Sequence, residues 1–307
     1  MQTPFSPLYR SKWLTACTVL ALTGALSNAQ NPAGPPRSVV FYSAGDGHPN
    51  NQIYTMNPDG TNPRQVTFDT ASDVDPDISP DGKYFVFTSN QTGNNDIYIM
   101  DRSGTTFDLT NNPADDEWAR FSPDGKEIVF DSNRDGGVFE IFVMNTDGSG
   151  TSTQLTFPPT LGRYPSWSPD GKQIIFRRGI DVYVMNADGS APTQLTNEAP
   201  PSFAQMANFS PDGRYITFMS FREGYCSVFL MNSDGTGQTN LTPKVAADPS
   251  TSWCSRAPAW STNGHEIYFM SFRPSTGGHN QVFVINTDGT NEQQLTSAGT
   301  SGEPRAR

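Results

Sequence analysis

The chain has 307 residues, a formal net charge of −11 and 11% aromatic residues, of which 20 are Phe. This apolar content can build one large core or a ring of smaller cores, and a charged fraction of 17% is too low for a disordered chain. The acidic balance argues against nucleic acid and anionic membranes as partners, because binding to phosphate needs clustered Lys and Arg.

Residues 1–29 have the residue order of a secretory signal peptide. Arg10 and Lys12 precede an apolar run over 13–26, and small residues follow. Because the run is short for a membrane span, we expect cleavage and no membrane insertion afterwards, with an uncleaved anchor as the alternative. We expect an unstructured lead over 30–37 and a periplasmic or extracellular protein.

A four-residue turn motif then recurs through the chain at intervals of roughly 45 residues, a spacing typical of stacked repeat units. Ser-Pro-Asp-Gly occupies Ser79–Gly82, Ser122–Gly125, Ser168–Gly171 and Ser210–Gly213, and Ser-Thr-Asn-Gly follows at Ser261–Gly264. Pro favours the second position of a type I turn and Gly the fourth, so each copy predicts a tight link between antiparallel strands.

Each turn motif lies within a unit of four predicted short strands. The first strand precedes the turn and carries an apolar residue at Ile78, Phe121, Trp167, Phe209 or Trp260. The second ends in Phe41, Phe87, Phe130, Phe176, Phe218 or Phe269. The third contains an adjacent aliphatic and aromatic pair, such as Ile97 and Tyr98, and the fourth ends in Val-Thr or Leu-Thr.

The third strands are apolar on both faces, because adjacent residues of a strand point in opposite directions. An antiparallel sheet with two apolar faces needs a neighbouring sheet on each side. Radial packing around an axis provides those neighbours, so we predict an all-β fold, a β-propeller with four antiparallel strands in each of six blades. A linear solenoid is the alternative, but it would need capping units at both ends.

The first blade lacks its first strand, and the end of the chain offers a replacement. Residues 302–307 include Pro304-Arg305-Ala306, which aligns with Pro165-Ser166-Trp167. We therefore predict that this C-terminal segment joins the N-terminal blade and closes the ring, which removes open sheet edges. The expected blades are 38–73 with 302–307, 74–115, 116–160, 161–200, 201–250 and 251–300.

These repeats resemble the WD40-like PD40 repeat of the TolB-type β-propeller family over essentially all of 38–307. The resemblance implies a six-bladed propeller in the periplasm or outside the cell, and a docking surface for an envelope lipoprotein. The protein after which the family is named carries an α/β domain before its propeller, and we expect no counterpart here. That difference leaves a TolB-like role in envelope complexes open.

One face of the predicted propeller collects Arg and aromatic side chains from its loops. The candidate ligand-binding residues are Arg134, Arg163, Arg177, Arg222, Arg256, Arg273, Trp118, Tyr164, Phe203 and Trp253. Arg and aromatic residues are enriched at interface hot spots, so they indicate a binding face. The alternative is that many of these Arg residues pair with nearby Asp and Glu.

Two cysteines remain beyond the predicted signal peptide, Cys226 and Cys254, and both belong to loops of the same predicted face. In an oxidising compartment they are expected to form a disulfide that fixes the connection between the fifth and sixth blades. The alternative is two separate thiols.

No predicted metal or catalytic centre stands out. Asp73, Asp75 and Asp77 alternate before the first turn motif and could face one side of a strand as a cation site, although a solvated acidic rim is the simpler interpretation. The Asp-Gly pairs lack the full order of calcium ligands. We find no cluster of His and carboxylates and no nucleophile elbow, and we expect no cofactor.

The sequence therefore favours a monomeric, non-catalytic propeller that binds a protein or a glycan at its loop face. The alternative is a propeller enzyme, a metal-dependent lyase or hydrolase with its site in the central funnel. The fold alone does not distinguish these functions.

Overall fold

The computed structural model describes residues 38–44, 49–159, 161–243, 254–297 and 299–306, and the statements below concern these residues. The signal peptide predicted over 1–29, the lead over 30–37 and Trp253 lie outside the described residues. Among the described residues, no helix is long and apolar enough to span a membrane.

The described chain forms six antiparallel sheets of four strands each, with a single 3-10 turn, η1 (Pro274–Thr276). The innermost strands are β4 (Asp73–Ile78), β8 (Asp116–Phe121), β12 (Gly162–Trp167), β16 (Ala204–Phe209), β20 (Cys254–Trp260) and β24 (Thr300–Ala306). The second strands are β1 (Val39–Ala44), β5 (Tyr84–Ser89), β9 (Glu127–Ser132), β13 (Gln173–Arg178), β17 (Tyr215–Ser220) and β21 (Glu266–Phe272).

The third and fourth strands complete each sheet towards the outside. The third strands are β2 (Gln52–Met56), β6 (Asp96–Asp101), β10 (Glu140–Asn145), β14 (Asp181–Asn186), β18 (Ser227–Asn232) and β22 (Asn280–Asn286). The outermost strands are β3 (Arg64–Gln65), β7 (Thr106–Asp108), β11 (Thr153–Gln154), β15 (Thr193–Gln194), β19 (Thr239–Asn240) and β23 (Gln293–Gln294).

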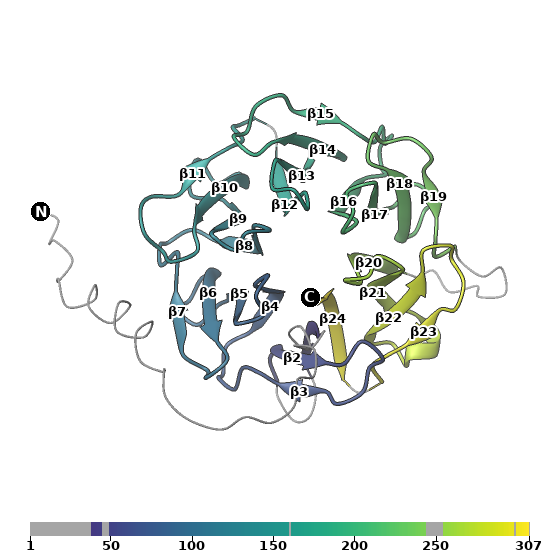
Figure 1. Cartoon of the computed structure of the whole chain (residues 1–307), viewed down its shortest axis with the longest axis horizontal. Coiled ribbons are helices and arrows are strands. Elements are labelled where there is room, and N and C mark those ends of the chain that lie inside the picture. Colours follow the sequence, from purple (N-terminus) through teal and green to yellow (C-terminus); the bar gives the residue numbers. More distant parts are fainter. Residues whose placement is uncertain (1–37, 45–48, 160, 244–253, 298, 307) are drawn as a thin grey trace, which may run out of the picture. The chain divides into compact units, whose positions relative to one another are not determined.

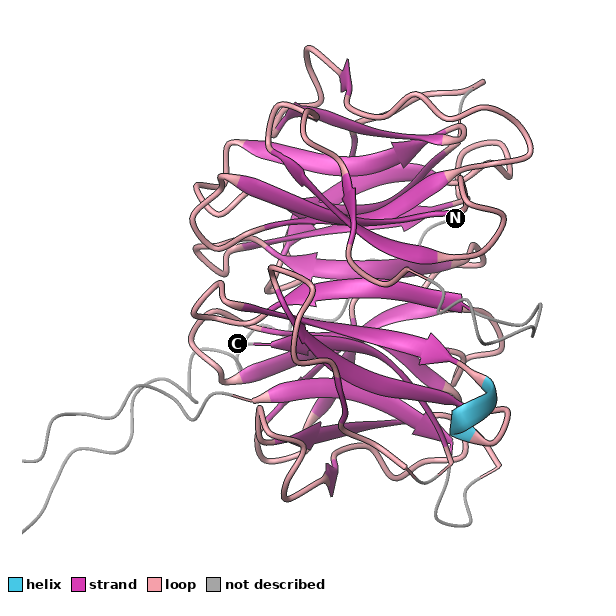
Figure 2. Cartoon of the chain, turned by 90° about the vertical axis from the view of Figure 1, so that its right-hand side faces the viewer, coloured by secondary structure: helices cyan, strands magenta, loops and turns pink. Residues whose placement is uncertain are grey.

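The six sheets are blades arranged around a central axis, with the innermost strands nearest that axis (Figure 1). Each innermost strand contacts the innermost strands of both neighbouring blades, so the ring is continuous. This confirms the predicted six-bladed, four-stranded propeller. The side view shows the strands running between two faces that carry the turns and loops (Figure 2).

We call the two faces by the connections they carry. The turn face holds the Ser-Pro-Asp-Gly turns and the turns between third and fourth strands. The loop face holds the connections between second and third strands and those that enter each innermost strand. Antiparallel order within each blade places these connections at opposite ends of the strands.

The first blade is completed by the C-terminal strand, as predicted. Strand β24 pairs antiparallel with β1, with Val39 opposite Ala306 and Ser43 opposite Ser301. This strand begins at Thr300, slightly earlier than the sequence indicated. The small side chain of Ala306 does not prevent pairing, because the strand is held by main-chain hydrogen bonds and packs beside β20 and β4.

Hydrogen bonds within each turn motif explain its residue types. In the first copy, Ser79 Oγ donates to Asp81 at 2.7 Å and accepts from the amide of Tyr84 at 2.9 Å. Asp81 also accepts from the amide of Lys83, and the amide of Gly82 donates to the carbonyl of Ser79. The same network recurs in the other four copies, with Asn in place of Asp in the last.

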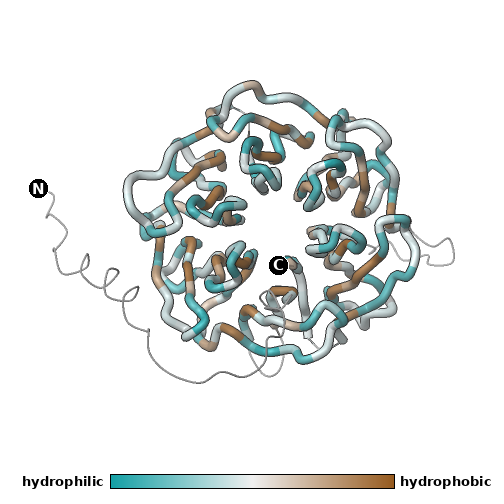
Figure 3. Tube along the Cα trace, viewed as in Figure 1, coloured by the Kyte–Doolittle hydropathy of each residue, from teal (hydrophilic) through white to brown (hydrophobic). Residues whose placement is uncertain are grey.

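Apolar clusters fill the spaces between neighbouring blades. One cluster joins Val40, Tyr42 and Ile53 of the first blade to Phe85 and Phe87 of the second, for example. Hydrophobic residues are concentrated within the blades, whereas the perimeter is more hydrophilic (Figure 3). Both faces of each sheet are therefore buried by the next sheet around the ring.

Candidate functional site

Each innermost strand contains one residue in the left-handed backbone region, at the same position in all six blades. We call these six residues the channel ring: Asp75, Trp118, Tyr164, Met206, Ala257 and Glu303. Their φ angles lie between 51° and 58°, and the strand register shifts at each of them. Such a bulge redirects the side chain, and here it directs these side chains towards the axis.

The channel ring is apolar on one side and acidic on the other. Trp118, Met206 and Ala257 form one buried cluster with Tyr164 packed against it, although the four residues come from four different blades. The rings of Trp118 and Tyr164 meet edge to face at 4.6 Å between centroids. The remaining two members, Asp75 and Glu303, are carboxylic acids from adjacent blades.

The two acids of the channel ring share a proton-dependent interaction. Burial raises the pKa of Asp75 well above its ordinary value, and the charge of Glu303 and a hydrogen bond with it raise this pKa further. Two close carboxylates in a buried site raise the cost of charging each other, so this side of the ring favours a proton on Asp75 more than a solvated aspartate would.

A charged cluster lies beside the aromatic half of the ring at the loop-face mouth of the channel. Arg163 pairs with Glu117 and with Asp131, the latter at 3.3 Å, and the amide of Tyr164 donates to Asp131 at 2.8 Å. The Arg163 guanidinium also lies 3.9 Å from the ring centroid of Phe139. Burial raises the pKa of Asp131 to about 7, although the charge of Arg163 opposes this shift.

Arg177 extends this cluster towards the next blade. It donates to Gln205 at 2.6 Å and to the carbonyl of Gly179 at 2.7 Å, and it lies over the ring of Phe203 at 5.3 Å. Burial lowers its pKa. The structure therefore brings Trp118, Tyr164 and Phe203 to the same mouth as two of the candidate arginines.

Three of the candidate arginines have a different role, which repeats in three blades. Arg134, Arg222 and Arg273 each donate from Nε to the Ser two residues earlier, at 2.9, 3.0 and 2.8 Å. Each also lies over an aromatic pair of its own blade. Their acidic partners are Asp116, Glu198 and Glu292. These arginines stabilise their own blades, as the alternative interpretation of local pairing anticipated.

Arg256 lies half-buried on β20, and its charge acts on Tyr42 of the neighbouring blade, lowering a pKa that burial otherwise raises. The structure joins Cys226 and Cys254 in a disulfide, which links the start of β18 to the start of β20. This bond connects the fifth and sixth blades at the loop face.

The three aspartates of β4 are not a solvated rim, and this expectation is wrong. Asp73, Asp75 and Asp77 are only 0%, 5% and 4% exposed. They do not share one side of the strand either, because the left-handed backbone of Asp75 interrupts the alternation. Asp77 accepts from the amide of Phe121 in the next blade at 3.1 Å. Within the described residues, no three or more His, Cys, Asp or Glu side chains group as metal ligands.

Sequence reasoning missed Glu117, Asp131, Met206 and Glu303. A positional signal does exist for the channel ring, because its members in blades two to six lie four residues before the Ser of each turn motif. Asp131 carries no such signal, since the equivalent positions of other blades hold unrelated residue types.

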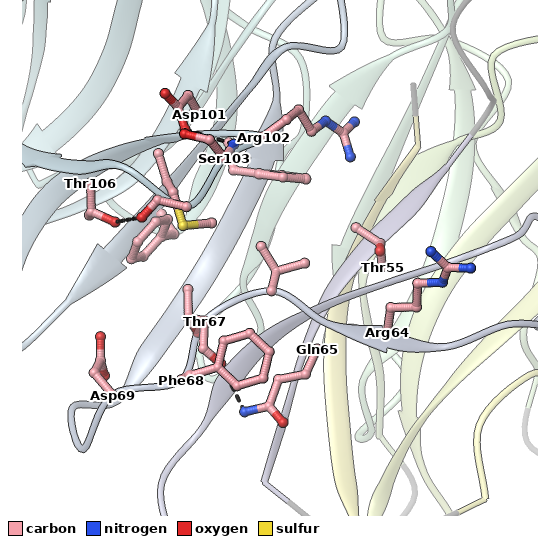
Figure 4. Close-up of a pocket in the computed structure, with 15 residues that line it drawn as sticks. Thr55, Arg64, Gln65, Thr67, Phe68, Asp69, Asp101, Arg102, Ser103 and Thr106 are labelled. Carbon is pink, nitrogen blue, oxygen red and sulfur yellow. Dashed lines mark hydrogen bonds between the residues drawn. The ribbon is translucent and has the colours of Figure 1, made fainter.

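Away from the channel, a cavity of about 610 Å³ lies at the perimeter between the first two blades (Figure 4). Arg64, Phe68 and Asp69 line it from the first blade, and Asp101 and Arg102 line it from the second. Phe68 is 73% exposed. This cavity shares no residues with the channel.

The fold and the channel define this chain as a six-bladed β-propeller with a polarised central channel. Comparison with known families matches residues 76–181 and 165–304 to the TolB beta propeller domain, which together span more than half of the chain. The chain therefore belongs to the TolB β-propeller family.

Individual relatives agree with this assignment. The Tol-Pal system protein TolB of Desulfosudis oleivorans is 35% identical over 72 residues, and the match spans 22% of this chain and only 16% of that protein. The crystal structure of TolB from Acinetobacter baumannii superposes with a TM-score of 0.71 at 22% identity, covering 90% of this chain and 67% of that one.

The same fold also occurs in an enzyme. Hydrazine synthase of Kuenenia stuttgartiensis superposes with a TM-score of 0.71 at 15% identity, covering 89% of this chain and 47% of that one. At this level of identity the likeness shows the fold alone, so the function must be argued from the site.

Proposed function

We propose that this chain is a secreted or periplasmic propeller that binds a protein partner at the loop-face mouth of its channel, without catalysis. The observation that carries this proposal is the cluster of Arg163, Tyr164, Trp118 and Arg177 at that mouth. Arg, Trp and Tyr are the residue types most enriched at interface hot spots.

The geometry of the cluster supports binding. Arg163 is fixed by two carboxylates, and Tyr164 is fixed by its packing on Trp118, so a partner would meet side chains that are already ordered. Such preorganisation lowers the entropy that binding costs. Arg163, Tyr164 and Arg177 also remain partly accessible.

The family relationship favours a protein partner over a glycan. The Desulfosudis relative is named as a component of a Tol-Pal system, so a Tol-Pal component of the same cell envelope is the partner class to test first. The cluster holds charged groups that pair with each other, and no described group of three metal ligands supports the alternative of a metal-dependent lyase or hydrolase.

The experiment compares two charge-removing variants on opposite faces. The probe is the purified Pal lipoprotein, without its lipid, from the organism that encodes this chain. A biosensor measures the Kd of each propeller variant for this probe. Arg177→Ala should weaken binding at least tenfold, which corresponds to about 1.4 kcal/mol. Arg214→Ala is the control, because Arg214 is exposed on the turn face, where it pairs with its neighbour Asp212 and lies over the ring of Tyr215.

Equal affinity of the two variants would overturn the proposed face. If Arg177→Ala leaves Pal binding unchanged but weakens binding to a purified envelope glycan, the partner is a glycan and the proposal of a protein partner is wrong. Stoichiometric metal in the purified protein, accompanied by turnover, would favour the enzyme.

A further inference from the structure

The turn face carries a cavity at the other end of the innermost strands from the charged cluster around Arg163. It is a cavity of about 410 Å³ at the ends of the innermost strands and beside the Ser-Pro-Asp-Gly turns. Its polar lining includes Arg120 of β8, Arg305 of β24 and Asn208 of β16. Cavities of this size hold small organic ligands in many proteins.

The two arginines of this cavity are deeply buried and incompletely bonded. Arg120 is 4% exposed and Arg305 is 8% exposed. Arg120 donates to the carbonyls of Asp75 and Ala119, and Arg305 donates to the carbonyl of Pro258. Within the described residues, neither arginine forms an ion pair, and Nε and Nη2 of Arg120 and Nε of Arg305 have no acceptor.

A third side chain of the same lining also has a donor without a partner. The indole Nε1 of Trp167 is buried and has no acceptor. The equivalent indole of the sixth blade, Trp260, donates to the carbonyl of Asn208 at 3.1 Å. A buried donor without an acceptor costs about 1–3 kcal/mol, and more when it is charged. Among the described residues of this lining, the buried groups without a partner are all donors, so a bound acceptor would satisfy them.

The charges around the cavity define the acceptor further. Arg120 and Arg305 are the cations of the lining, and Asp77 is its acid. Burial and the like charge of Arg120 lower the pKa of Arg305 to about 9, so Arg305 is still charged at neutral pH. The charges of Asp75 and Glu303 of the channel ring also act on Arg305, so the choice of ligand rests on the unbonded guanidinium donors, which suit a carboxylate.

The rest of the lining is apolar and would accept an organic body. Phe121, Phe209 and Trp260 contribute rings, and the prolines of the turn motifs, Pro123, Pro169 and Pro211, form the rim. A free inorganic ion would leave this surface unused.

We propose that the turn-face cavity binds a small organic monocarboxylate, whose carboxylate lies between Arg120 and Arg305 and whose apolar body lies against the aromatic rings. Arg residues bind carboxylates through directed, charge-assisted hydrogen bonds. The indole of Trp167 supplies a further donor. This site opens on the face opposite the proposed protein-binding mouth, and Arg120 lies between the two, 5.4 Å from the ring centroid of Trp118.

Titration calorimetry with phenylacetate tests the proposal. Phenylacetamide is the matched ligand, because it has the same ring and no charge, and inorganic phosphate tests a generic anion. We expect saturable binding of phenylacetate with one site per chain, and at least tenfold weaker binding of both comparison ligands. Absence of saturable phenylacetate binding, or equal or tighter binding of either comparison ligand, would overturn the proposal.

Protein variants locate the binding. Arg120→Gln and Arg305→Gln should each weaken phenylacetate binding at least tenfold, whereas Arg214→Gln, which removes an exposed charge from the same face, should not change it. Ser166→Asp is a further variant that places a carboxylate in the same lining, and we expect it to prevent phenylacetate binding and to raise the melting temperature.

If the two arginine variants do not fold, Ser166→Asp tests the location of the site. Unchanged phenylacetate affinity in that variant would contradict binding in the turn-face cavity. Arg177→Ala separates the two proposals, because it should reduce partner binding at the loop face and leave phenylacetate binding unchanged.

Discussion

Asp73 is fully buried at the start of the innermost strand β4. Burial raises its pKa from 3.8 to about 6. The folded protein therefore binds more protons than the unfolded chain between these two pH values. The free energy of unfolding contributed by Asp73 consequently falls as pH rises from about 4 to about 6, and it stays lower above that range.

Asp73→Asn should remove this loss in the free energy of unfolding, because the amide side chain carries no charge at any of these pH values. At pH 8 we expect the variant to be more stable by about 1–3 kcal/mol, since each unit of pKa shift corresponds to about 1.4 kcal/mol. At pH 4 the gain should vanish. Urea denaturation at several pH values measures the difference, with the exposed Asp135→Asn as control. A gain that does not depend on pH would contradict the assignment to a buried charge.

Residue-scale features were predictable only where the sequence repeats them. The residue types of the channel ring differ in every blade, and none is the Gly that a left-handed backbone usually favours. No repeated residue type in the sequence therefore marks the bulge. The arginines of the three Ser-x-Arg segments did repeat. Their packing depends on aromatic pairs that come together only in the folded blade, so the sequence alone left a binding face and local pairing both open.

At the scale of one element, a Thr two residues beyond the end of each fourth strand bonds back to the third strand. In the fourth blade, Thr196 Oγ1 accepts from the amide of Val182 and donates to Asp181, both at 2.9 Å. The amide bond recurs in all six blades. The repeated Thr therefore satisfies a buried main-chain group that the two-residue outer strand cannot reach.

Thr196→Val preserves the shape of the side chain and removes the hydroxyl. It leaves the amide of Val182 without an acceptor, so we expect a loss of about 1–3 kcal/mol in the free energy of unfolding. Chemical denaturation checks this value. Thr193→Val changes an exposed Thr of strand β15, three residues before Thr196, and should change stability by less than about 0.5 kcal/mol. Equal effects would show that the hydroxyl of Thr196 is not structural.

The turn motifs and the third strands were predictable because the interactions that form them involve residues close together in the sequence. The Ser and Asp of each turn motif bond within a few residues, and the apolar pattern of the third strand marks burial on both faces. The lateral cavity beside Phe68 was not predictable, because it is formed by two blades whose outer strands carry no repeated residues there.

At the scale of the molecule, ring closure depends on close packing around Gly302 of β24. A Cβ atom at this position would lie 2.1 Å from the Sδ atom of Met270 and 2.9 Å from the hydroxyl of Tyr42. Met270 belongs to the sixth blade and Tyr42 to the first, so Gly302 lies where the two ends of the ring meet.

Gly302→Ala should therefore destabilise the closure. We expect a loss of about 1–3 kcal/mol, as for other overpacked cores, and faster hydrogen exchange in β1 and β24 than in the other blades. Thermal unfolding and hydrogen exchange measured by mass spectrometry check both results, with Thr300→Ala as control on the same strand. Unchanged exchange in β1 would show that this packing does not hold the ring closed.

The pairing of β1 with β24 has a consequence for biosynthesis. A ribosome makes β1 first among the strands of the propeller and β24 last, so the first blade keeps an unpaired edge while the other five, each contiguous in the chain, can assemble as they emerge. We expect a nascent chain halted before Thr300 to be sensitive to proteases and to attract chaperones at that edge. Protection would then arrive only when the final strand of the propeller has emerged, which couples quality control to closure of the ring.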